Sequence, residues 1–165
     1  MKSIVLAILM MPGICYLAQS QDEMRKLDPM VGNWKGEGWF MDRSGVRYEF
    51  TQQEEITMEL DETALLIKGK GFSEGKTIHN AMAVVTFDSV SSAYDFHSFL
   101  SDGRKTQANL KVVDEGVFQW GFDVPNGRIK YYIKIDEGKW YEKGEFSSDG
   151  TAWFPFIEFN LSKLD

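Results

Sequence analysis

The sequence predicts an all-β protein, a single antiparallel up-and-down β-barrel of about ten strands with a short N-terminal helix. Three observations lead to this prediction. Apolar and polar residues alternate with a period of two from Val31 onward, turn signals that contain glycine recur, and no long helical pattern follows Val31. The last five turn glycines, Gly103, Gly116, Gly127, Gly138 and Gly150, follow one another at intervals of 13, 11, 11 and 12 residues. This spacing leaves about eight residues for each strand.

The N-terminal segment has the pattern of a signal peptide. Lys2 precedes an unbroken apolar run over residues 4–11, and the small residues Ala18 and Ser20 flank a cleavage point. We therefore expect residues 1–20 to be removed by cleavage after Ser20. The alternative of a membrane anchor meets the difficulty that the apolar stretch is too short to span about 30 Å of hydrocarbon.

The predicted cleavage places the barrel domain at residues 21–165 and the mature protein in the periplasm or outside the cell. The chain has one cysteine, Cys15, and it lies within the segment to be removed. Disulfides and cysteine catalysis are therefore not expected in the mature protein. Lipid attachment at Cys15 is the alternative.

The composition excludes several classes of function. The chain carries 18 basic and 25 acidic side chains, for a net charge of −7, so neither nucleic acid nor insertion into a membrane after cleavage is expected. With 165 residues and 14% aromatic side chains, it can form one domain with a proper core. A monomer or homodimer is expected.

The predicted elements begin with a short helix over residues 22–27, where acidic residues precede basic ones and Pro29 follows. Asn126-Gly127 and Asp149-Gly150 are typical of hairpin turns. The predicted strands cover residues 33–41, 46–60, 64–71, 78–87, 94–100, 105–113, 117–124, 128–135, 140–147 and 153–161. Ten strands in one open sheet would leave exposed edges, so a closed barrel is expected, with a two-sheet sandwich as the alternative.

The most distinctive string is residues 31–38, Val-Gly-Asn-Trp-Lys-Gly-Glu-Gly. Glycines at alternate positions allow a strand to coil sharply in a barrel. We therefore assign structural roles to Gly32, Trp34, Gly36 and Gly38, and expect Trp34 to fill the closed end of the barrel without touching a ligand.

Together with residues 48–56, this string resembles the first two strands of nitrobindin-like barrels, which are ten-stranded relatives of lipocalins and fatty-acid-binding proteins. Residues 140–153 are similar to the end of bacterial calycin-like domains of unknown function. The resemblance implies a calycin fold and, for a nitrobindin, haem bound by a histidine near the C-terminal strand. Residues 154–161, the matching stretch, contain no histidine.

Neither catalysis nor a cofactor is expected. His79 and His97 lack the spacing of a metal site, and the period of the strand groups His97 with the polar face. The sequence shows no signature of a Ser-His-Asp triad. Glu54 and Glu55 are adjacent in a strand and so project to opposite faces, which prevents them from acting as a catalytic pair.

The second strand carries an anomaly, because Gln52 and Glu54 share the parity of its apolar residues. An inward Glu54 should be partnered, protonated or exposed to a wet cavity. The alternative is a β-bulge near Gln53 that turns both side chains to solvent. On the inward interpretation, the predicted ligand-binding residues are Tyr48, Phe50, Gln52, Glu54, Phe118, Trp120 and Tyr131.

The sequence thus favours an exported, non-catalytic barrel that binds a small apolar or amphipathic molecule in its interior. Two alternatives stay open. One is a haem-binding nitrobindin-like protein or an isomerase acting through Glu54, and the other is a filled barrel with a structural or protein-binding role.

N-terminal sequencing of the exported protein tests the predicted leader. We expect the mature chain to begin at Gln21, because Ala18 and Ser20 occupy the small-residue positions before the cleaved bond. A mature chain that begins with a lipid-modified Cys15 would contradict this and indicate a lipoprotein.

Overall fold

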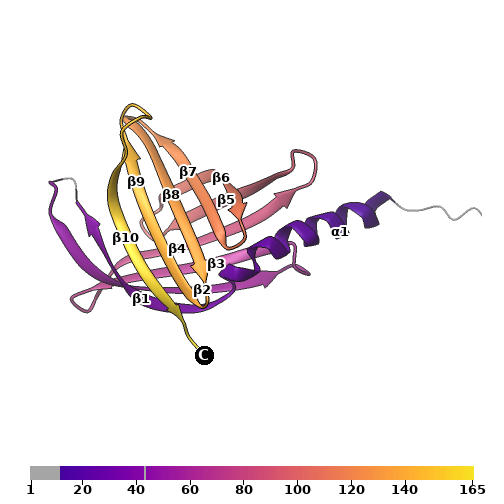
Figure 1. Cartoon of the computed structure of the whole chain (residues 1–165), viewed down its shortest axis with the longest axis horizontal. Coiled ribbons are helices and arrows are strands. Elements are labelled where there is room, and N and C mark those ends of the chain that lie inside the picture. The colour runs from indigo at the N-terminus through magenta and orange to yellow at the C-terminus, as the bar shows by residue number, and fades with distance from the viewer. Residues whose placement is uncertain (1–11, 43) are drawn as a thin grey trace, which may run out of the picture.

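The computed structural model describes residues 12–42 and 44–165, and in it ten antiparallel strands close into a single barrel (Figure 1). The predicted fold class is confirmed. The strands are β1 (Gly32–Met41), β2 (Arg47–Glu59), β3 (Ala64–Ser73), β4 (Lys76–Asp88), β5 (Ala93–Leu100), β6 (Lys105–Asp114), β7 (Val117–Val124), β8 (Gly127–Asp136), β9 (Lys139–Ser147) and β10 (Phe154–Lys163).

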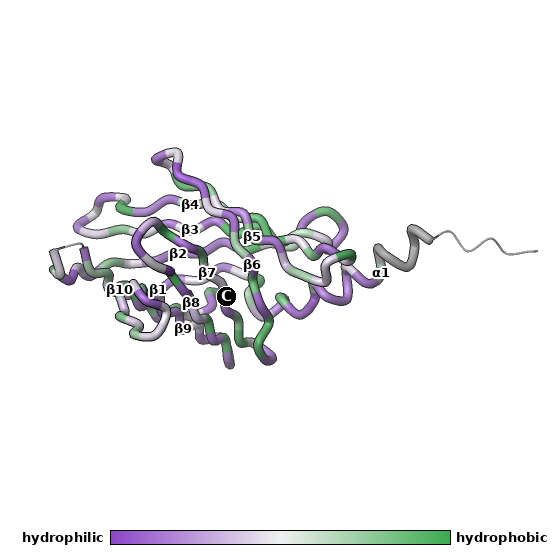
Figure 2. Tube along the Cα trace, turned by 90° about the horizontal axis from the view of Figure 1, so that it is seen from above, coloured by the Kyte–Doolittle hydropathy of each residue, from purple (hydrophilic) through white to green (hydrophobic). Residues whose placement is uncertain are grey.

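Each strand pairs with its neighbours along the chain, and β1 pairs with β10 to close the ring. Hydrophilic and hydrophobic residues alternate along the strands (Figure 2), as expected for a wall with one face toward solvent and one toward the interior. The closure excludes the two-sheet sandwich, and it leaves no strand edge unpaired among the ten.

The closing seam depends on two glycines of β1. A Cβ atom on Gly36 would collide with the backbone of Asn160, and one on Gly38 would collide with Glu158 and Phe159. These positions therefore require glycine because β10 crosses β1 at very short range. The structural role predicted for Gly36 and Gly38 follows from this close approach.

The N-terminal helix is longer than the sequence predicts. The helix α1 spans Pro12–Met24, and the 3₁₀ helix η1 follows over Arg25–Met30. The predicted helix over residues 22–27 therefore had the wrong bounds: the backbone stays helical upstream of Asp22, and Pro29 lies within η1. The apolar run of the predicted signal peptide, residues 4–11, lies outside the described residues.

The end of α1 and the whole of η1 close one end of the barrel. Met24, Leu27 and Met30, here called the plug, are 0–1% exposed. Trp34 packs beneath them, and its Nε1 atom donates a hydrogen bond to the carbonyl oxygen of Met30 at 2.8 Å. The predicted role of Trp34 as a filler of the closed end agrees with this position. Upstream of the plug, α1 extends away from the barrel (Figure 1).

The plug is tied to the turns at that end of the barrel. The Gln21 side chain donates to the carbonyl oxygen of Asp61 in the β2–β3 turn at 2.8 Å, and Tyr94 at the start of β5 donates to the carbonyl oxygen of Glu23 at 2.8 Å. The plugged end thus carries the β2–β3 and β4–β5 turns. The opposite end, with the β1–β2 and β7–β8 turns, is called the open end below.

Within the described part of the chain, no helix has both the length and the apolar character needed to cross a membrane.

Candidate functional site

The interior toward the open end is lined by an aromatic stack formed by Phe96, Trp120 and Tyr131. The ring centroids of Phe96 and Trp120 lie 4.4 Å apart, and those of Trp120 and Tyr131 lie 4.1 Å apart with an angle of 6° between the planes. Trp120 and Tyr131 are paired across β7 and β8 and are only half-buried. The stack therefore presents aromatic surface that the protein itself does not cover.

Glu54 projects into the same interior from β2. The pairing of β2 with β1 and with β3 is continuous through Gln52, Gln53 and Glu54, so the bulge considered at Gln53 is absent from the structure. A Cβ atom on Gly69 of β3 would lie 2.9 Å from both carboxylate oxygens of Glu54. The Glu54 carboxyl group thus occupies the space that the missing side chain of Gly69 leaves.

Gln52 orients Glu54. Its Nε2 atom donates a hydrogen bond to Oε1 of Glu54 at 2.6 Å, and its own side chain lies over Gly71. The other carboxylate oxygen, Oε2, is buried and has no hydrogen-bond partner among the described residues. Unpartnered buried acceptors are rare in folded proteins, because a lost hydrogen bond to water is normally replaced.

Glu142 on β9 is a second interior carboxyl group, 7% exposed, that the sequence analysis missed. Its Oε2 atom accepts a hydrogen bond from Nε1 of Trp140 at 3.1 Å. The signal was present, since Glu142 shares the parity of Trp140 and Gly144 in the same strand. Glu54 and Glu142 are called the carboxyl pair below.

The electrostatics of the carboxyl pair favour the protonated form. Burial raises the pKa of Glu54 from 4.5 to about 7, and the hydrogen bond from Gln52 opposes this only in part. Burial, followed by repulsion from Glu54, raises the pKa of Glu142 to about 8. Burial also raises the pKa of Tyr131, with a further contribution from Glu142. Neither glutamate forms an ion pair with a described residue.

The structure brings together most of the predicted site residues. Gln52, Glu54, Trp120 and Tyr131 lie around one interior region, and Phe50 is buried beside Phe40 and Phe159.

Two predicted site residues lie elsewhere. Tyr48 is 43% exposed and stacks on Phe40 at the rim, because β2 extends there into the β1–β2 hairpin. Phe118 is fully buried, paired with Ile133 in the core that surrounds the plug. Shared parity places a side chain on the inner face, but its height along the strand decides whether it lies at the rim or in the packed core.

The histidines lie on opposite faces of the wall. His97 lies between the inward residues Phe96 and Ser98 of β5 and so projects outward, as predicted. The Cβ atom of His79 lies 3.2 Å from the position of a Cβ on Gly71, which places His79 on the interior side of β4 toward the open end. Among the described residues, no three His, Cys, Asp or Glu side chains are grouped to hold a metal ion.

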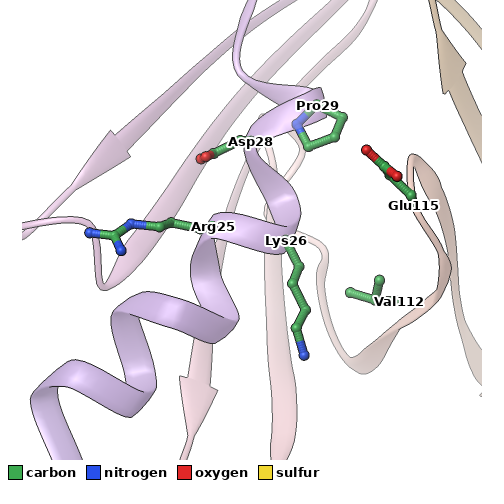
Figure 3. Close-up of a pocket in the computed structure, with 6 residues that line it drawn as sticks. All are labelled: Arg25, Lys26, Asp28, Pro29, Val112 and Glu115. Atoms are coloured by element: carbon green, nitrogen blue, oxygen red, sulfur yellow. The ribbon is translucent and has the colours of Figure 1, made fainter.

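A separate hollow of about 630 Å³ lies on the outer surface at the plugged end (Figure 3). Its lining residues are Arg25, Lys26, Asp28, Pro29, Val112 and Glu115. The basic groups are already occupied, because Lys26 pairs with Glu23 at 2.7 Å and Arg25 with Asp22 at 3.2 Å. The hollow offers no unpartnered buried group, so we place the candidate site at the carboxyl pair and the aromatic stack.

Solved structures of other proteins share the barrel fold of this chain. Rv2717c from M. tuberculosis aligns with a TM-score of 0.64 and 12% identity over 86% of this chain and 97% of that chain. The S-type phycobiliprotein lyase CPES from Guillardia theta aligns with a TM-score of 0.59 and 10% identity over 88% and 93%.

A protein of unknown function from the DUF3598 family of Nostoc punctiforme aligns with a TM-score of 0.54 and 9% identity, over 84% of this chain and 49% of that chain. No protein-family model matches the chain, and no curated protein does. At these identities the likeness shows the fold alone.

The pH dependence of stability tests the carboxyl pair. The unfolded chain loses both protons near pH 4.5, whereas the folded protein retains them to about 7 and 8. The contribution of the pair to the free energy of unfolding is therefore fully present below pH 4.5. It falls as the pH rises from 4.5 to the folded pKa of each group, by up to about 1.4 kcal/mol per pH unit for each group. In urea unfolding, the free energy of unfolding of Glu54→Gln and of Glu142→Gln should decline less steeply with rising pH than that of the wild type. Glu55→Gln, which alters the outward neighbour, is the control, and equal declines in all four proteins would contradict the assignment.

Proposed function

We propose that the protein is a non-catalytic binding protein for a small, largely apolar molecule, which it holds in the open half of the barrel. The observation that carries this proposal is the position of the half-buried Trp120 and Tyr131 rings on the same interior as a buried carboxylate oxygen that lacks a partner. An apolar wall with a few convergent polar groups is typical of ligand sites.

The energetics of the interior argue against a purely structural barrel. Burying a carboxyl group without a full set of partners costs several kcal/mol, and apolar residues of similar volume would fill the same space more favourably. Gly69 and Gly71 make room for the side chains of Glu54 and Gln52, which a larger residue at either position would displace. Such an arrangement is retained at a cost in stability, which is typical of a binding site.

The fold analogy gives weaker support. One structural neighbour is a phycobiliprotein lyase, so a barrel of this kind serves a function beyond structure in that protein. The analogy does not transfer a ligand or an activity, because one fold hosts many functions.

Export from the cytoplasm is part of the proposal. The side chain of Gln21, the residue that follows the predicted cleavage point, bonds to the β2–β3 turn. Removal of residues 1–20 would therefore keep this contact and the three residues of the plug.

The haem-binding alternative lacks the donor expected from the nitrobindin resemblance. β10 contains no histidine, and of the two histidines in the described chain only His79 lies on the interior side of the wall. The residues of β10 therefore do not fit a haem held as the resemblance implies.

Binding of the neutral fluorescent probe N-phenyl-naphthylamine tests the proposal. We expect saturable binding at one site, weakened by about tenfold in Trp120→Ala, because the substitution removes aromatic surface from the wall. Trp39→Ala is the matched control, since Trp39 lies on the outer face under Arg47. Native mass spectrometry of protein from its own host would identify a retained molecule. Absence of both probe binding and a retained mass would favour the filled barrel.

Titration with haemin distinguishes the alternative. We expect weak binding without a sharp Soret band, because β10 has no histidine to supply the axial imidazole. A sharp band at one-to-one stoichiometry that is lost in His79→Ala and kept in His97→Ala would favour the haem-binding alternative over the proposed function.

A further inference from the structure

We propose that Glu54 and Glu142 together bind a positively charged nitrogen, so that the interior selects a flat apolar molecule with one ammonium group at its inner end. This inference rests on the proposed function and names the chemical class of its ligand. It also gives a binding role to Glu142, which is not among the site residues predicted from the sequence.

The first step is that the carboxyl groups of Glu54 and Glu142 lie in one region of the interior. Glu54 on β2 is paired with Trp34 of β1, and the Trp34 ring meets the Trp140 ring edge-on with centroids 5.5 Å apart. Trp140 in turn donates to Glu142. The two tryptophans thus form a chain of contacts between the two glutamates, and repulsion from Glu54 contributes to the raised pKa of Glu142.

The second step is that the protein provides too few donors for two carboxylates. It supplies one amide N–H from Gln52 and one indole N–H from Trp140, both neutral. Oε2 of Glu54 has no partner among the described residues. A carboxylate can accept about four hydrogen bonds, so most of the acceptor capacity of the pair is free.

The third step is that nearby basic groups are used elsewhere. Arg104, which influences Tyr131, pairs with Asp102 at 2.7 Å in the β5–β6 turn. Lys163 lies with its Nζ atom 5.4 Å from the centre of the Trp34 ring, and it forms no ion pair with either glutamate. Within the described chain, the counter-charge of the pair is therefore left to a ligand.

The fourth step concerns the ligand. A neutral donor would satisfy one oxygen, whereas an ammonium group has three donors and a charge that offsets the repulsion between two carboxylates. Trp120 and Tyr131, which stack on each other and stay partly exposed, supply apolar surface for the body of the ligand. A carboxylate ligand such as a fatty acid would be repelled.

Three naphthalene probes of equal size separate these possibilities by calorimetry near neutral pH: naphthylmethylamine, naphthylmethanol and naphthoate. For the wild type we expect the amine to bind at least about tenfold more tightly than the alcohol, and naphthoate to bind most weakly. Binding of the amine should also release protons to the buffer, because the carboxyl pair must ionise to meet the cation.

Glu54→Gln and Glu142→Gln should each reduce the preference for the amine to about twofold or less while the alcohol binds as before. The control Glu55→Gln should keep the full preference. Circular dichroism of each variant verifies the fold, and either glutamine variant that folds is sufficient for the test.

The outcomes separate the two proposals. Equal binding of amine and alcohol, with loss of both in Trp120→Ala, would overturn the cation site and leave the ligand-binding function intact. Failure of all three probes to bind would contradict the proposed function and this inference with it. A preference for the amine that survives in both glutamine variants would place the cation elsewhere.

Discussion

The pairing of β1 with β10 is the constraint on which the rest of the structure depends. It closes ten strands into a ring, and every second residue of each strand is then committed to the interior. The close approach at Gly36 and Gly38 allows this seam to form. A ring of ten strands encloses a wide interior, which requires large side chains such as Trp34, Trp120 and Trp140 or an inserted segment to fill it.

The two ends of the barrel meet this requirement differently. At one end the plug fills the interior, and Trp34 joins it to the wall through its hydrogen bond to Met30. Toward the other end, Trp120 and Tyr131 are only half-buried, and Gly69 of β3 faces the carboxyl of Glu54. This contrast between a packed end and a region with an unpartnered carboxylate oxygen supports the proposal that a ligand binds in the second.

Much of the fold followed from the sequence, because alternation and turn glycines are local signals. Gln52 and Glu54 could be placed inside on the same basis, since their parity matched that of Phe50 and Ile56. Local signals do not show how far along the barrel axis a side chain lies. Phe118 has the right parity, but it is fully buried in the packed core around the plug.

The extent of α1 and the role of Glu142 also lay beyond the sequence analysis. Hydrophobic periodicity does not mark where a helix stands free of the barrel. The resemblance of residues 140–153 to the end of calycin-like domains carries no information on the inward position of Glu142. The importance of Glu142 arises from Glu54 on a distant strand, a proximity that exists only in the closed ring.

The central claim, that two interior carboxyl groups hold their protons near neutral pH, is tested most directly by carbon NMR of the glutamate side-chain carboxyls across a pH titration. The account predicts that one resonance titrates near pH 7 and another near pH 8, the first absent in Glu54→Gln and the second in Glu142→Gln. Titration of every glutamate at its ordinary pH, close to 4.5, would contradict it.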